Sequence, residues 1–216
     1  MIGLVEELVL LSIEDDGAIA HTAGSADFGM ALIGACLVEL SNQGRIDADL
    51  DSLRLISTAP TGHPVLDRVL ALLGEGDQGT VEQWVTRLTI EVPELLRLTL
   101  RSLVTRGVLE RTETRFLWVL RSRRYPVIDG REQKEAKLRI LATLLGDDLP
   151  SPQDTVLLGL ARVGGLLEAF LSVAEIARLE GRIAQVGGID LFVRGVESAI
   201  REVQAERARA MMLPMF

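Results

Sequence analysis

The chain has 216 residues, 48% of them hydrophobic, with a formal net charge of −8 and a pI of about 4.9. This composition predicts one sizeable globular domain or two small ones, and it excludes both a low-complexity chain and a generally basic protein. The single cysteine, Cys36, excludes an intrachain disulfide, and we expect it to be a small core residue.

The N-terminal stretch "MIGLVEELVLLSIEDD" predicts a helix, because Leu4, Leu8 and Leu11 fall on one face. Glu6 and Glu7 occupy its first turn, where acidic side chains suit the helix dipole. A signal peptide would carry a basic segment here, and a membrane-spanning helix would need roughly 20 consecutive apolar residues. The chain has neither, so we expect a cytoplasmic protein that can touch a membrane without spanning it.

The next segment alternates turns with short elements. "DDG" at 15–17 predicts a turn, and a short strand can follow at 18–21. "FGMALIGACLVEL" is apolar on nearly every side, which predicts a central, buried helix. Gly44 suits the left-handed position that ends this helix, and the alternation over 45–57 predicts a hairpin.

Helical signals then continue to residue 107. Pro64 suits the first turn of a helix after a loop, and "GEGDQG" at 74–79 is a connector. Thr80 with Gln83 forms a capping-box pattern that starts the next helix. The stretch 93–107 reads as a further helix that begins near Pro93 and ends at a glycine.

A second hairpin is predicted in "VLERTETRFLWVL", with strands at 108–111 and 115–120 and a turn at 112–114. The stretch from 111 to 131 holds six arginines against two acids, so it carries +4 and leaves −12 for the rest of the chain. An anionic partner would therefore have to meet this one part of an otherwise acidic molecule.

The remainder predicts an amphipathic helix at 131–146 and three further helices to about residue 209, separated at Gly164–Gly165 and Gly187–Gly188. We therefore expect a mainly α fold, with residues 1–210 forming a single-domain helical bundle with short hairpins. Residues 211–216, "MMLPMF", form an apolar C-terminal tail.

No motif for catalysis or metal binding is present in the sequence. His21 and His63 are far apart, there is no cysteine cluster, and no glycine-rich loop follows a strand with the lysine that phosphate binding needs. Ser12, Ser57 and Cys36 lack a nucleophile motif. We expect no enzyme activity, no metal and no cofactor.

Binding is the remaining class of function, and the basic hairpin region is the candidate surface. The candidate lipid-contact residues are Arg97, Arg115, Arg121, Arg123 and Arg124, and the candidate hairpin contacts are Phe116 and Trp118. Arginine and aromatic side chains are favoured both at protein interfaces and at bilayer surfaces.

Four other interpretations remain open for the same residues, and one of them is a protein-interaction scaffold that self-associates through the hairpin without lipid specificity. The helix 93–107 and the strands after it could form the recognition helix and wing of a winged-helix DNA-binding protein, with Arg97, Arg101 and Arg106 on phosphates. The acidic net charge argues against a nucleic-acid partner. The arginines could instead pair with carboxylates of the chain itself, or the hairpin strand could be buried on both faces.

Several motifs in a fixed order resemble the Golgi phosphoprotein 3 family. They are "LVEELVLLSIEDDG", "CLVELSNQGRI", "TAPTGHPVLDRVL", "LVTRGVLERTETRFLWV" and the following "YPV", spread from about Leu4 to Ile200. The resemblance implies a helical bundle with one projecting β-hairpin that contributes to self-association. It also implies a peripheral adaptor that binds phosphatidylinositol-4-phosphate or other anionic phospholipid and holds protein clients.

The lipid pocket of that family is matched incompletely. The resemblance calls for a tryptophan near "HTAGSAD" at 21–27, where this chain has none, and for arginines at positions filled here by Ile33 and near Pro93 and Leu96. Only Arg97 stands close by. The chain thus lacks the convergent donors that a phosphomonoester needs, and the hairpin arginines become the expected lipid contact.

Overall fold

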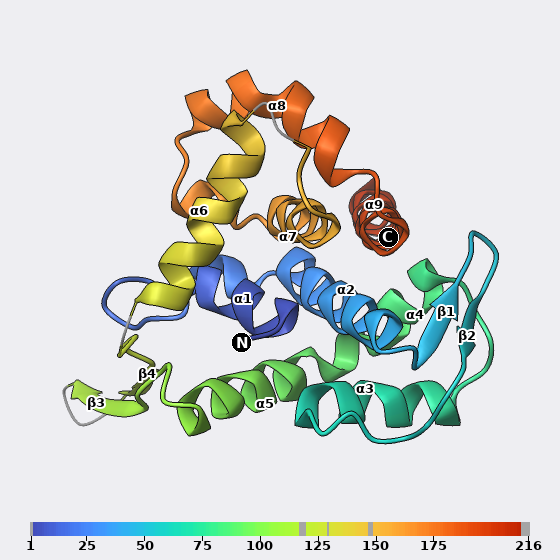
Figure 1. The fold of residues 1–216 in the computed structure, drawn as a ribbon, viewed down its shortest axis with the longest axis horizontal. Helices are drawn as coiled ribbons and strands as arrows, with labels where there is room; N and C mark the ends of the chain where they lie inside the picture. Colours follow the sequence, from blue (N-terminus) through green and yellow to red (C-terminus); the bar gives the residue numbers. More distant parts are fainter. Residues whose placement is uncertain (1, 117–119, 129, 147–148, 213–216) are drawn as a thin grey trace.

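Two buried helices form the centre of the molecule in a computed structural model, which describes residues 2–116, 120–128, 130–146 and 149–212. They are α1 (Leu4–Leu11), in which every residue is buried, and α2 (Ala26–Asn42) (Figure 1). Helix α2 begins where the Ser25 hydroxyl accepts a hydrogen bond from the backbone N–H of Phe28 at 3.0 Å. A helix that is apolar on all sides must be covered on all sides, which explains its central place.

The other helices surround this pair (Figure 1). On one side lie α3 (Pro64–Glu75) and α5 (Val92–Thr105), with α4 (Val81–Leu88) at the end of α2. On the other side lie α6 (Arg131–Leu145), α7 (Pro152–Val163), α8 (Val173–Gly187) and α9 (Leu191–Met212). The predicted mainly α fold is confirmed.

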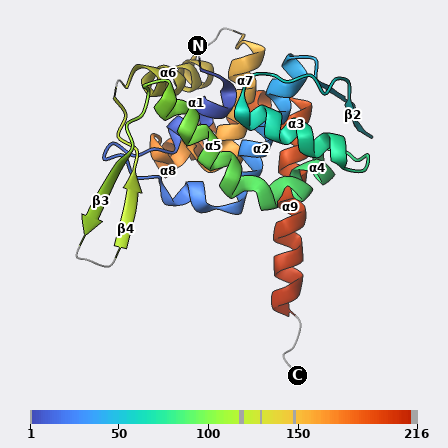
Figure 2. The ribbon, with the colours of Figure 1, turned by 90° about the horizontal axis from the view of Figure 1, so that it is seen from below.

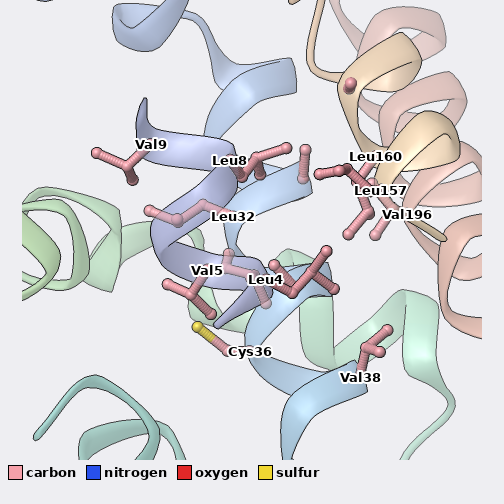
Figure 3. Close-up of a cluster of buried hydrophobic side chains, with 14 of the residues drawn as sticks. Leu4, Val5, Leu8, Val9, Leu32, Cys36, Val38, Leu157, Leu160 and Val196 are labelled. Carbon is pink, nitrogen blue, oxygen red and sulfur yellow. The ribbon is translucent and has the colours of Figure 1, made fainter. Parts of the chain in front are cut away.

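The core closes where α1 and α2 meet the C-terminal helices (Figure 3). Leu4 and Leu8 lie opposite Leu157 of α7 and Val196 of α9, and all of them are buried. Cys36 is fully buried in the same cluster, as the sequence predicted, and burial raises the pKa of its thiol. The cysteine is therefore a packing residue.

Helix boundaries follow the local signals in the sequence. Thr80 and Gln83 form the predicted capping box at the start of α4, and Pro64 is the first residue of α3. Gly44 and Gly107 have φ values of 64° and 73°, so they hold the left-handed positions after α2 and α5.

The first hairpin forms as predicted, and the second forms in a different register. Strands β1 (Ile46–Ala48) and β2 (Leu53–Leu55) pair as an antiparallel hairpin. In the second hairpin, β3 (Thr112–Phe116) pairs with β4 (Leu120–Arg124), so the turn predicted at 112–114 is wrong. The β-branched Thr112 and Thr114 favour an extended strand over a turn.

This second hairpin projects from the helical body, and Figure 2 shows the C-terminal part of α9 extending from the same side. Helix α9 continues through Met212, so the first two residues of the predicted tail are helical. The strand predicted at 18–21 is reduced to a bridge between Ile13 and Ile19, followed by a 3₁₀ turn, His21–Gly24. No helix in the described ranges is both long and apolar enough to cross a bilayer.

Helices α7 and α8 meet through two glycines. A Cβ atom on Gly159 would lie 2.5 Å from the carbonyl oxygen of Gly187 and 2.9 Å from a methyl of Val193. Because one of these neighbours is backbone, the contact cannot relax by a change of rotamer. The absence of a side chain at Gly159 thus sets the distance between the two helices.

Candidate functional site

The base of the β3–β4 hairpin is fixed by the turn at 15–17. The backbone N–H of Tyr125 donates to the carbonyl of Gly17 at 2.7 Å, and Tyr125 is 8% exposed. Gly17 has a φ of 78°, and a Cβ atom there would lie 2.5 Å from the backbone nitrogen of Pro126. Only glycine fits this position, so the "DDG" motif sets the direction in which the hairpin projects.

Strand pairing brings the predicted basic residues together along one ribbon. In the register, Arg115 stands opposite Arg121, and Glu113 stands opposite Arg123. Opposite residues of an antiparallel pair have Cβ atoms about 5 Å apart, and like charges placed so are destabilising. The structure describes the backbone of these four residues but not their side chains, and Trp118 of the predicted contact lies outside the described residues.

Two of the predicted lipid-contact arginines already have acidic partners. The guanidinium of Arg124 donates to the Asp16 carboxylate, and Arg97 Nε donates to Glu94 Oε2 at 2.6 Å. Arg97 also lies eight residues before the end of α5, about 12 Å along the helix axis. The structure therefore does not bring Arg97 together with the hairpin arginines.

Helix α5 packs against more of the fold than a recognition helix would in the winged-helix alternative. It buries Leu95, Leu100 and Leu103, and it contacts α1, α2 and α3. One of the arginines predicted to contact phosphate, Arg106, donates to the Glu6 carboxylate. At the family's pocket positions, Ile33 is fully buried in α2 and Leu96 packs against the core.

A buried polar cluster around Glu6 joins α1 to α5 and to the loop before α3. Glu6 Oε1 accepts from Ser102 Oγ and from Arg106 Nη1, each at 2.9 Å, and lies 3.2 Å from His63 Nε2. Glu6 Oε2 accepts from the backbone N–H of Gly3 at 2.7 Å. The Glu6 side chain is 1% exposed, so these partners replace the water that a carboxylate needs.

The partners of Glu6 also set its protonation state and that of His63. Burial alone would raise the pKa of Glu6, but hydrogen bonds from His63, Gly3 and Ser102 outweigh it and lower the pKa to about 2. The hydrogen bond to Glu6 raises the pKa of His63 above its ordinary value. The cluster thus favours an ionised Glu6 beside a protonated His63.

This arrangement predicts a specific dependence of stability on pH. The pKa of Glu6 is lower in the folded chain, so its contribution is present above pH 4.5 and is lost as the pH falls toward 2. Between these values the wild type should lose on the order of 3 kcal/mol of unfolding free energy more than Glu6→Gln. Urea unfolding at several pH values measures this difference, and parallel curves for the two proteins would contradict it.

The His63 contribution has the opposite sign. Because the folded pKa is raised, the stabilisation is present below pH 6.5 and is lost as the pH rises through the folded value. A His63→Gln variant should therefore show a smaller loss of stability on the alkaline side than the wild type.

The only role predicted for Glu6 and Glu7 was to suit the helix dipole, and their burial was not predicted. The sequence does indicate this burial, because "LVEELVLL" places apolar residues on every side of the helix and leaves no face for solvent. Acids in such a helix must find partners elsewhere in the fold. The partners of Glu6 lie up to 100 positions away in the sequence, so no local pattern identifies them.

A third acid, the partly buried Glu39 of α2, caps the start of α1. Its Oε1 accepts from the backbone N–H of Val5 at 2.7 Å, and burial raises its pKa. A Cβ atom on Gly3 would lie 2.6 Å from the same oxygen, so the glycine allows this close approach. Among the residues that the structure describes, no group of three or more histidine, cysteine or acidic side chains could hold a metal ion.

Comparison with known proteins gives two matches. The family model described as Golgi phosphoprotein 3 (GPP34) matches residues 4–203. The chain is also similar to the vacuolar protein sorting-associated protein 74 of Eremothecium gossypii, with 27% identity over 164 residues, which cover 66% of this chain and 49% of that protein. The chain thus spans about half the length of this curated relative.

Proposed function

The chain belongs to the Golgi phosphoprotein 3 family, and on that premise we propose that it is a non-enzymatic adaptor that binds anionic phospholipid, phosphoinositides included, through the β3–β4 hairpin. It would reach the membrane from the cytoplasm as a peripheral protein. The name of the relative refers to protein sorting. We carry this over as the proposal that protein clients are the second class of partner.

One observation carries the lipid proposal: the register that sets Arg115 opposite Arg121. Two like charges at that spacing repel each other, and a phosphate group bound between them would remove the repulsion and gain charge-assisted hydrogen bonds. The hairpin projects beyond the body of the molecule on the same side as the end of α9, so both elements could contact one surface (Figure 2).

Partitioning onto vesicles tests this proposal. Each basic group near an anionic bilayer contributes about 1 kcal/mol, so replacing three should weaken partitioning about a hundredfold. The hairpin variant combines Arg115→Gln, Arg121→Gln and Arg123→Gln. Sedimentation with vesicles that contain anionic phospholipid, and with neutral vesicles, measures the effect. Vesicles with phosphatidylinositol-4-phosphate or phosphatidylserine at matched charge should bind alike, because Ile33, Pro93 and Leu96 fill the pocket positions.

The control variant removes the same charge from other surfaces. It combines Arg54→Gln, Arg178→Gln and Arg201→Gln, which replace three exposed arginines outside the β3–β4 hairpin. It should bind as the wild type does. Equal loss in both variants would show that net charge alone governs binding. Equal partitioning of wild type and hairpin variant, with a mass in light scattering that rises with concentration, would favour the alternative that the hairpin contacts a second copy through its free strand edges.

A further inference from the structure

A cavity outside the hairpin lies where the N-terminus meets three other elements. It has a volume of about 290 Å³, and a water molecule occupies about 30 Å³ of liquid. Its lining comes from residue 2, α1, the segment just after α5, the first nine residues of α6 and the start of α7: Ile2, Glu7, Arg106, Val108, Glu132, Glu135, Arg139 and Gln153. The cavity can therefore hold a small ligand of several heavy atoms.

Glu7 lines this cavity with an incomplete set of partners. Its side chain is 8% exposed, and one carboxylate oxygen, Oε1, accepts from Arg139 Nη1. The other oxygen, Oε2, is buried and has no hydrogen-bond partner in the described part of the chain. A buried carboxylate oxygen without a donor costs free energy, so the residue is poised to accept one more hydrogen bond.

Neither arginine of the cavity donates to this second oxygen in the structure. Arg139 Nε donates to Asp154 Oδ1 at 2.6 Å while its Nη1 holds Glu7, and Arg106 Nη1 donates to Glu6. Both guanidinium groups are thus already bound to carboxylates.

Apart from these two arginines, the charged side chains that line the cavity are acidic. Glu132 and Glu135 stand in the first two turns of α6, and the structure describes no ion pair for either carboxylate. Burial raises the pKa of Glu7, and the negative charges of Asp154 and Glu135 raise it further, against the effect of Arg139. The electrostatic field inside the cavity therefore favours a cation with hydrogen-bond donors.

We propose that this cavity, the Glu7 cavity, binds the primary ammonium group of a small aliphatic amine. The ammonium would pair with the Glu7 carboxylate, whose unpartnered oxygen becomes accessible only when that side chain turns, and with the Glu132 and Glu135 carboxylates, which also line the cavity. The apolar side chains of Ile2 and Val108 would contact the methylene chain. An ammonium has three donors and no acceptor, which matches a site whose unsatisfied groups are acceptors.

The ammonium can belong to a free diamine or to a lysine side chain, and two probes separate these sources. Putrescine represents the free diamine, and Nα-acetyl-lysine amide represents the side chain. Isothermal titration calorimetry of the full chain at low salt should show one site. The probe that binds with the higher affinity identifies the source of the ammonium group. The neutral 1,4-butanediol, which has the same chain length as putrescine, should not bind.

The decisive variant is Glu7→Gln, which keeps the shape of the side chain and removes its charge. It should weaken the tighter probe at least about tenfold, because a charge-assisted hydrogen bond is lost. Glu180→Gln on α8 removes one charge elsewhere and should leave the affinity unchanged. If Glu7→Gln does not fold, judged by circular dichroism, the double variant Glu132→Gln/Glu135→Gln replaces it and should also weaken binding about tenfold.

Three results would overturn the proposal. One is a wild type that binds neither amine at millimolar concentration. Another is an affinity that Glu7→Gln, or the double rim variant in its place, leaves unchanged. The third is equal binding of 1,4-butanediol, which would show that the cavity does not select for charge. None of these results would affect the lipid proposal, because the Glu7 cavity and the hairpin share no residue.

Discussion

Replacing Glu6 with alanine is expected to lower the free energy of unfolding by about 3–5 kcal/mol, a large part of the stability of an ordinary domain. The variant removes the acceptor shared by His63, Ser102 and Arg106 and leaves the N–H of Gly3 without its partner. Urea unfolding near pH 6, followed by circular dichroism, measures the change.

The control for Glu6→Ala is an ion pair of the same chemistry on the surface. Arg97 and Glu94 are bonded at two atoms, yet their side chains are 50% and 41% exposed. Arg97→Ala should cost no more than about 1 kcal/mol, because water replaces the lost partner. Equal losses in the two variants would show that the Glu6 cluster contributes nothing beyond an ordinary surface pair.

The second large effect is expected where α7 meets α8. Gly159→Ala should lower the free energy of unfolding by about 2–3 kcal/mol, because the new methyl would overlap the carbonyl of Gly187 and force the helices apart. Gly181→Ala, on the exposed face of α8 with no atom near its Cβ, should raise it by about 0.5–1 kcal/mol. Opposite signs from the same substitution identify packing as the cause, whereas a stable Gly159→Ala would contradict the tight contact.

Much of the fold could be predicted because its signals are local. The capping box at Thr80, the proline at the start of α3 and the left-handed glycine after α5 each depend on neighbours within a few residues. The burial of α2 followed from the apolar residues on all its sides.

The register of the second hairpin could be predicted only in part, because tertiary contacts act on it beside the local preference of Thr112 and Thr114 for a strand. Leu109 bridges to Val127 and Tyr125 is bonded to Gly17, which extends the ribbon downstream of the predicted strands. The alternation of side chains in the sequence predicted that the strand continues through the apolar run after Phe116. In the structure, the paired residues of β3 end at Phe116 and those of β4 begin at Leu120.

The candidate site could be predicted only in part for the same reason. The arginine cluster is visible in the sequence as a local excess of charge. The pairing of Arg124 with Asp16 joins residues 108 positions apart, and the contact of Glu7 with Arg139 joins residues 132 apart. The charged residues could therefore be found in the sequence, but the ion pairs that join distant ones could not.

The proposal that the hairpin contacts anionic lipid can be tested at a single side chain. The chain has two tryptophans, and Trp84 is buried in the core. Trp84→Phe therefore leaves Trp118, whose sequence position falls between those of β3 and β4, as the one tryptophan. Adding vesicles of anionic phospholipid should shift the Trp118 emission to the blue, and brominated lipid chains should quench it. Neutral vesicles should do neither. An emission spectrum that is the same in buffer, with neutral vesicles and with anionic vesicles would contradict the proposal.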